Sequence, residues 1–304
     1  MKQIWMVALI FSLGQEEKVE LRYGFKKGET FPLRLRYALN VKLEQLPEGL
    51  QGILSEEPID IKFEGVVEVE VTDVAGNGTA SLSGNWRTAK ASGHVMVNDL
   101  DFAFDSSKEK GDKAKKKEEM DDPGFMDMQD QLNKMVRLPL KFSVDPLGKV
   151  TLAEGSGRLG ALEGPFRSLN GLMGPLPRNK IGKGDTWKEK IHLEMPGVAG
   201  NIDLVVTTNN SYDSAEKVDG RDVVTIKSTF TVSAGEPVSD LNITLKIEGE
   251  GEGRMTFLLQ EGRPAKSQSL LKARVNAVLP NPGGDGEMEI KAVVKIETGH
   301  DLGK

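Results

Sequence analysis

The sequence contains no cysteine among its 304 residues. This excludes disulfide bonds, thiolate zinc sites, iron–sulfur clusters, a cysteine nucleophile and a lipid-anchored N-terminal cysteine. Histidine is almost as rare, and His94, His192 and His300 lie far apart in the chain without partners at a catalytic or metal-binding spacing. We therefore predict no catalytic residue, no metal site and no cofactor, and we expect a protein that is not an enzyme.

An excess of positive charge is also lacking. The chain has 40 lysines and arginines against 46 acidic residues, so its formal net charge is −6. A mildly acidic chain with dispersed charges is poorly suited to neutralising phosphates, so we expect no nucleic-acid partner. Acidic pairs such as Asp99 and Asp101, or Asp121 and Asp122, lack the spacing of a calcium loop and are expected to face solvent.

The N-terminus differs from the rest of the chain. Lys2 precedes an apolar run over residues 4–13, and the small residues Ser12 and Gly14 come just before the polar Gln15. This order is typical of a secretory signal peptide, and the run is shorter than the roughly 20 residues that span a bilayer. The alternative is a buried first strand or helix. We predict that residues 1–14 are a signal peptide, that the protein is exported to the periplasm or beyond, and that the mature chain has no transmembrane segment.

Apolar and polar residues alternate over long stretches after this start. From Phe31 to Leu43 every odd position is apolar or aromatic and almost every even position is polar or charged, which places the two sets on opposite faces of a strand. Residues 61–71 continue the pattern before a turn at 75–78. We predict a mainly β fold of long antiparallel strands in a strongly curved sheet or half-barrel, with one face solvated. Later stretches with the same alternation are 224–232, 241–247 and 288–296.

Two stretches break the alternation and predict one or two packed helices. Residues 106–122 have almost no apolar side chains, which predicts a solvated, disordered insertion. Apolar residues then recur at helical spacing and predict a helix over about 123–136. A second helical connector is expected over residues 156–174, although its glycines make it a poor helix former.

A short repeat indicates that the chain has two related halves. Residues 25–31 (FKKGETF) and 181–187 (IGKGDTW) share a Lys-Gly-acid-Thr core followed by an aromatic residue. Each half also carries a strand–turn–strand unit, around residues 142–150 and 257–264. The sequence does not decide whether the halves share one sheet or form two domains. The expected β units are residues 15–155 and 175–304.

The glycine run at 249, 251 and 253 superficially resembles a nucleotide-binding loop. The residues after it are strand-like, whereas a phosphate loop should open a helix. We therefore interpret these glycines as strand positions that admit a bend or a bulky neighbour across the sheet.

The arrangement of these segments resembles a group of exported bacterial proteins with a domain of unknown function, frequent in planctomycetes. The resemblance rests on Phe104–Ser107, a polar insertion, a short helix, the segment Phe142–Val150, and then Gly174–Pro177 and Ile181–Trp187. It spans most of the mature chain. Because the shared residues are those of turns and strand starts, the resemblance implies a β-rich fold and export, and no activity.

Function is expected to follow from where the methionine-containing helix lies. Across a curved sheet it would either form a lid over an apolar cavity or simply fill the sheet. The first outcome predicts an exported, non-catalytic protein that binds an apolar or lipid-like envelope ligand. The alternative, favoured by a filled interior, is a structural or protein-interaction module of the envelope without a small-molecule ligand. The candidate ligand-lining residues are Trp86, Phe102, Phe104, Phe125, Met128, Leu132 and Met135.

Overall fold

A computed structural model describes residues 18–47, 57–95, 100–108, 132–153, 174–197, 200–234, 244–280 and 286–302. The expected signal peptide and nearly all of the expected connector 156–174 lie outside these residues. The described strands are β1 (Thr30–Gln45), β2 (Ile59–Val74), β3 (Ala80–Val95), β4 (Leu100–Asp105), β5 (Leu140–Val144), β6 (Val150–Leu152), β7 (Thr186–Gly197), β8 (Gly200–Val218), β9 (Arg221–Ala234), β10 (Thr244–Leu258), β11 (Arg263–Pro280) and β12 (Glu287–Leu302).

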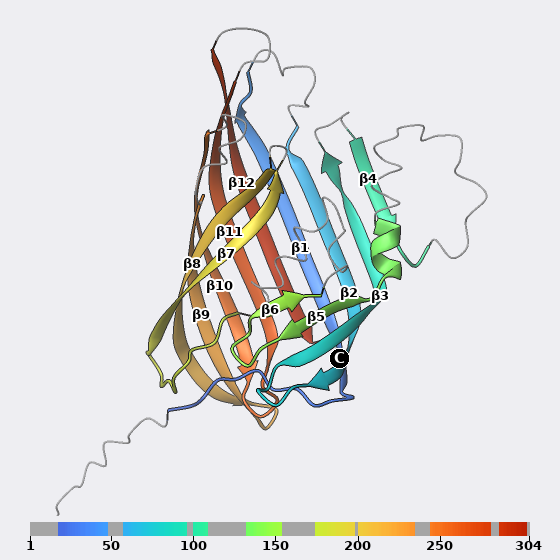
Figure 1. Ribbon diagram of the computed structural model, residues 1–304, viewed down its shortest axis with the longest axis vertical. Coiled ribbons are helices and arrows are strands. Elements are labelled where there is room, and N and C mark those ends of the chain that lie inside the picture. The colour runs from blue at the N-terminus through green and yellow to red at the C-terminus, as the bar shows by residue number, and fades with distance from the viewer. Residues whose placement is uncertain are drawn as a thin grey trace, which may run out of the picture.

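All twelve strands belong to one antiparallel sheet, which confirms the mainly β fold. The strand order is β6-β5-β3-β2-β1-β12-β11-β10-β9-β8-β7, and β4 pairs with β3 beside this path. The sheet is strongly curved but does not close, since β6 and β7 are its two ends (Figure 1). Strands of both halves thus share one sheet, and the halves meet where β1 pairs with β12.

The repeat seen in the sequence has a structural counterpart at the start of β1 and of β7. The backbone N–H of Gly28 donates to the carbonyl of Val71, and that of Gly184 donates to the carbonyl of Tyr212, both at 2.8 Å. Both glycines have positive φ, at 80° and 85°. The acidic residue that follows each glycine binds back to the turn in the same way. The two motifs therefore form the same turn, each clamped to the neighbouring strand.

Strands β4 and β5 lie on the same edge of β3, one after the other. β4 pairs with residues 90–95 of β3, whereas β5 pairs with residues 80–84. β4 and β5 therefore share one strand position beside β3, and residues 106–139 connect them along the chain. The first residues of this connection, 106–108, form a turn in which Ser106 N–H donates to the carbonyl of Ala89 (3.0 Å), so the expected insertion begins with an ordered turn.

One short helix is described, over residues 132–137. It covers only the end of the helix expected over 123–136, whose earlier residues lie outside the described part of the chain. Its apolar residues Leu132 and Met135 are 1% and 2% exposed and pack into the main core. This short helix thus packs against the sheet through the apolar residues whose helical spacing predicted it.

The inner, concave face of the sheet carries the apolar side chains. Strand register places Leu35, Val67 and Phe257 on this face, together with the other odd-numbered residues of 31–43, 59–71 and 245–257 in β1, β2 and β10. Buried residues from β2 and from β10 belong to one hydrophobic cluster, although three strands of the sheet separate them. A single cluster that includes residues of such distant strands indicates that this face is the concave one.

Residues 18–29 run along one end of the curved sheet and close it with the core residues Leu21 and Tyr23 (Figure 1). We call this segment the strap. Its backbone is hydrogen-bonded to both halves: Tyr23 N–H donates to the Pro146 carbonyl (2.9 Å), and Gly24 N–H donates to the Gly262 carbonyl (2.8 Å). The strap therefore joins the β5–β6 turn of the first half to the β10–β11 turn of the second.

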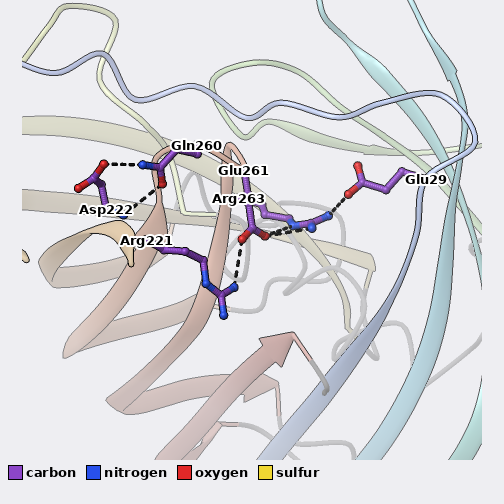
Figure 2. A network of polar contacts seen from close by, with 6 residues as sticks. All are labelled: Glu29, Arg221, Asp222, Gln260, Glu261 and Arg263. Atoms are coloured by element: carbon purple, nitrogen blue, oxygen red, sulfur yellow. Dashed lines mark hydrogen bonds and ion pairs between the residues drawn. The ribbon is translucent and has the colours of Figure 1, made fainter. Parts of the chain in front are cut away.

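Polar contacts reinforce the same end of the molecule, as Figure 2 shows. Arg263 on β11 binds Glu29 of the strap at 2.6 Å and Glu261 at 3.0 Å, and Glu261 also accepts from Arg221 at 3.1 Å. The Arg263 guanidinium lies 5.0 Å from the ring centre of Phe31. This network links the first strand to a turn near the end of the chain.

The glycines on the inner face make room for aromatic rings. A Cβ atom added at Gly253 would lie 2.8 Å from the ring of Phe230, and one at Gly65 would lie 2.4 Å from the ring of Trp86. Gly251 and Gly253 are interior positions of β10, so the glycine run is part of a strand. The structural interpretation of this run is confirmed.

Candidate ligand-binding cavity

A cavity of about 780 Å³ lies on the concave face, away from the strap. Six neighbouring strands contribute to it, from β2 through β1, β12, β11 and β10 to β9. Because opposite residues in an antiparallel pair share a face, register identifies the lining side chains that point inward. They are Tyr37, Phe63, Ser228, Gly253, Ser269 and Thr298.

These six residues form a single line directly across the sheet. Starting from Phe63, each residue is the register partner of the next, in the order Phe63, Tyr37, Thr298, Ser269, Gly253, Ser228. Asn210 on β8 continues the line beyond Ser228. We call the segment from Tyr37 to Asn210 the polar row. It places hydroxyl and amide groups in the middle of an inner face whose other residues are mostly apolar.

Two hydrogen-bonded groups make up the polar row, with Gly253 between them. On one side the hydroxyls of Ser269 and Thr298 are 2.7 Å apart. On the other side Ser228 donates its hydroxyl to Asn210 Oδ1 at 2.6 Å, and Asn210 Nδ2 donates to Thr208 Oγ1 at 3.2 Å. These contacts fix the side chains before any ligand arrives.

The polar row is uncharged. Burial raises the pKa of Tyr37 to about 12, so its phenol is neutral at physiological pH. Charged residues of the same strands point to the outer face, where Arg36 pairs with Asp301 at 3.5 Å and with Glu64 at 4.0 Å. The inner face at this level thus offers hydrogen bonds without a fixed charge.

Apolar rows border the polar row on the side away from the strap. The next row contains Leu39, Ile296 and Leu271, and the one after it contains Val41, Val294 and Ala273. Most of these side chains are only partly buried in the described structure. The inner face therefore offers an apolar surface adjoining the hydroxyl groups.

His300 lies one row from the polar row on the strap side. Its side chain is 3% exposed, faces Leu35 and Ser267 across the strands, and neither ring nitrogen has a hydrogen-bond partner. Burial lowers the pKa of His300 to about 4, so the ring is neutral at physiological pH. The sequence did not predict this environment, because His300 stands near the chain end.

The predicted ligand-lining residues that the structure describes lie elsewhere. Phe102, Phe104, Leu132 and Met135 are buried in the packed core, and Phe125 and Met128 lie outside the described residues. Trp86 is partly buried and packs edge-to-face on Phe63, with ring centres 5.5 Å apart. None of the predicted residues that the structure describes lines this cavity; Trp86 contacts it only through Phe63.

A signal for the cavity residues is present in the sequence. In the alternating stretch 224–232 the inward position 228 is a serine, and the inward positions 298 and 269 are a threonine and a serine. Each is a polar residue at a position where the alternation calls for an apolar one. Such interruptions, aligned across strands, mark the polar row.

The other candidate groups do not assemble into a site. His94 lies 3.2 Å from Asp101 across β3 and β4, and His192 lies on β7. Among the described residues no group of three or more histidine, aspartate or glutamate side chains could hold a metal ion. In the same part of the chain no helix is long and apolar enough to cross a membrane.

Comparison with known proteins does not assign the chain to a family. No family model matches the chain, and no curated protein does. Two solved structures align at low TM-scores. DynF from the dynemicin biosynthesis pathway of Micromonospora chersina has a TM-score of 0.20 and 7% identity, over 100% of this chain and 94% of DynF. OmpT, an outer membrane protein of Vibrio cholerae, has a TM-score of 0.18 and 10% identity, over 90% and 99%. At such scores neither structure bears on the function.

Proposed function

We propose that this protein is an exported, non-catalytic binding protein that holds a lipid-like ligand against the concave face of its sheet. The observation that carries this proposal is the cavity of about 780 Å³, which the polar row lines and beside which the apolar rows of the same face lie. Cavities that bind small molecules typically measure about 300–1,000 Å³ and combine apolar walls with a few polar groups. This cavity has a volume in that range, and its inward lining combines the aromatic rings of Phe63 and Tyr37 with hydroxyl groups.

Binding without catalysis is inferred from the chemistry of the lining. The inward groups of the polar row are hydroxyl and amide groups, and Tyr37 is held neutral by burial. Acid–base or nucleophilic catalysis requires a group that gains or loses a proton near neutral pH, or an activated nucleophile. The polar row supplies neither, so we assign it to recognition.

Export is the part of the proposal that rests on the sequence. The order of positive, apolar and small residues over positions 1–14 supports removal of a signal peptide, and the resemblance to exported bacterial proteins agrees with it. Intact-mass analysis of protein recovered from the periplasm or the medium tests this step. A mass that still includes Met1 would refute it.

A cavity-filling variant tests the binding function. Ser269→Phe places a ring in the cavity, whereas Lys272→Phe adds the same ring to the outer face of the same strand. We expect Nile red, a neutral apolar dye, to bind the wild type and Lys272→Phe with increased fluorescence, and to bind Ser269→Phe much more weakly. Circular dichroism checks that both variants fold. A wild type that binds no dye, or a Ser269→Phe variant that binds it equally, would contradict the proposal.

A second candidate function is a structural or interaction module of the envelope. It is favoured by the filled core of the inner face, to which Phe102, Phe104 and Leu132 belong. The same dye experiment separates the two candidates. If the wild type binds no dye, the module is the better account.

A further inference from the structure

We infer that the polar row selects ligands whose polar group is uncharged, such as an alcohol, over fatty acids and alkylamines. This inference rests on the proposed binding function and specifies the class of ligand. It assigns Ser269 and Thr298 as the residues that determine specificity. Three features of the inner face lead to it: the hydrogen-bonding capacity of the row, the absence of a compensating charge, and the position of the apolar rows.

The hydrogen-bonding capacity of the row matches a hydroxyl group. Ser269 and Thr298 together have two O–H donors, and the contact between them at 2.7 Å uses one. One donor and several lone pairs therefore remain for a ligand. A ligand hydroxyl can accept from the free O–H and donate to a free lone pair, so both of its functions are satisfied.

An ionised group fits the same row poorly. A carboxylate only accepts hydrogen bonds and needs several donors to replace its water, yet the Ser228 hydroxyl already donates to Asn210. An ammonium brings a charge that the hydroxyls do not neutralise. Because burying a charge without a partner is strongly unfavourable, the row should discriminate against both ions.

No compensating charge stands opposite the row among the residues that line the cavity and point inward. In the next row away from the strap, Glu189 of the edge strand β7 faces Thr208 and points inward, but it does not line the cavity. It would repel an anion further. One row towards the strap, the buried His300 lacks partners and is neutral, so it does not attract an anion either.

The apolar rows determine how such a ligand lies. On the strap side of the polar row the inner face is packed core, with Met255 6% exposed and Ile226 1% exposed. On the other side Leu39, Ile296 and Leu271 are partly exposed. A hydrocarbon chain anchored by its hydroxyl at Ser269 and Thr298 would therefore extend over Leu39 and Ile296, away from the strap.

Displacement of Nile red by three ligands of equal chain length tests the inference. We expect dodecan-1-ol to displace the dye from the wild type at about tenfold lower concentration than dodecanoate or dodecylamine at pH 7.5, as expected for one or two well-formed hydrogen bonds. In Ser269→Ala/Thr298→Val this preference should disappear through an equivalent loss of dodecanol affinity, calculated from displacement with the dye affinity measured directly in the same variant. The control variant Thr231→Val, which removes an exposed hydroxyl from β9, should behave as the wild type.

The outcomes separate this inference from the proposed function. Equal or better displacement by dodecanoate or dodecylamine, or a preference retained by the double variant, would overturn the inference while binding itself stands. Failure of all three ligands to displace bound dye would overturn it in the same way. A wild type that binds no dye would overturn both.

Discussion

Arg263 and Glu29 form an ion pair at 2.6 Å across a sequence separation of 234 residues. Their side chains are 15% and 28% exposed, so the pair is partly shielded from water. Through it the residue that precedes β1 is bound to the β10–β11 turn (Figure 2). This contact and the strap hold the two halves of the sheet together at its packed end.

Replacement of Arg263 by methionine should destabilise the fold. It would leave Glu29 and Glu261 close to each other without their shared cation, and we expect a loss of about 1–3 kcal/mol in the free energy of unfolding. Arg221→Met removes a more exposed partner of Glu261 and should cost less than about 1 kcal/mol. Urea denaturation of both variants measures the difference, and equal losses would show that the network contributes little.

Removal of the His300 side chain should flatten the acid dependence of stability. Its pKa is about 4 in the folded chain and about 6.5 when unfolded, so between these values the unfolded state binds more protons. The free energy of unfolding should therefore fall by about 3 kcal/mol as the pH drops from about 6.5 to about 4.

The variant His300→Leu should lose this contribution and should be at least as stable as the wild type at pH 7, because two buried nitrogens without partners are removed. His94→Leu, beside the exposed Asp101, should keep the acid dependence. Urea denaturation across this pH range measures it. If the free energy of unfolding depends on pH in the same way in the wild type and in His300→Leu, the buried, neutral state of His300 is contradicted.

The packing of Trp86 over Gly65 predicts a compensating pair of substitutions. Gly65→Ala places a methyl group against the indole, 2.4 Å from its nearest ring atom, and should cost about 1–3 kcal/mol. In a Trp86→Leu background the same change should cost much less. Gly76→Ala is the control, since nothing lies within 4 Å of its added Cβ. A cost for Gly65→Ala that is independent of residue 86 would disprove the close packing.

The strap should be part of the cooperative fold. Leu21 is fully buried in the cluster that joins the two halves, so Leu21→Ala should lower the free energy of unfolding by about 2–5 kcal/mol. Lys26→Ala, at an exposed strap position, should change it by less than about 0.5 kcal/mol. Thermal or urea unfolding compares the two. A small effect of Leu21→Ala would show that the strap is dispensable.

The local structure could be predicted from the sequence because it depends on local patterns. The alternation from Phe31 to Leu43 identified β1, and the Lys-Gly-acid-Thr motifs identified equivalent turns at Gly28 and Gly184. Strand order could not be predicted in this way. The pairing of β1 with β12 is a long-range choice that the alternation of either strand leaves open.

The candidate cavity could not be predicted from the same local patterns, because it also depends on how the strands pair. Trp86 has the size and character of a ligand-lining residue, but its place against Gly65 and Phe63 follows from strand register. The polar row arises only when residues of six different strands are aligned. Singly, Ser228 or Thr298 is an ordinary interruption of a strand, and only the register makes them neighbours of the same cavity.

The central claim is that the concave face holds a ligand, and native mass spectrometry of the protein isolated after export tests it most directly. We predict that the wild type and Lys272→Phe carry one small molecule per chain, released on denaturation, and that Ser269→Phe carries much less. A wild-type mass equal to that of the polypeptide alone, together with failure to take up added dodecan-1-ol, would contradict the claim.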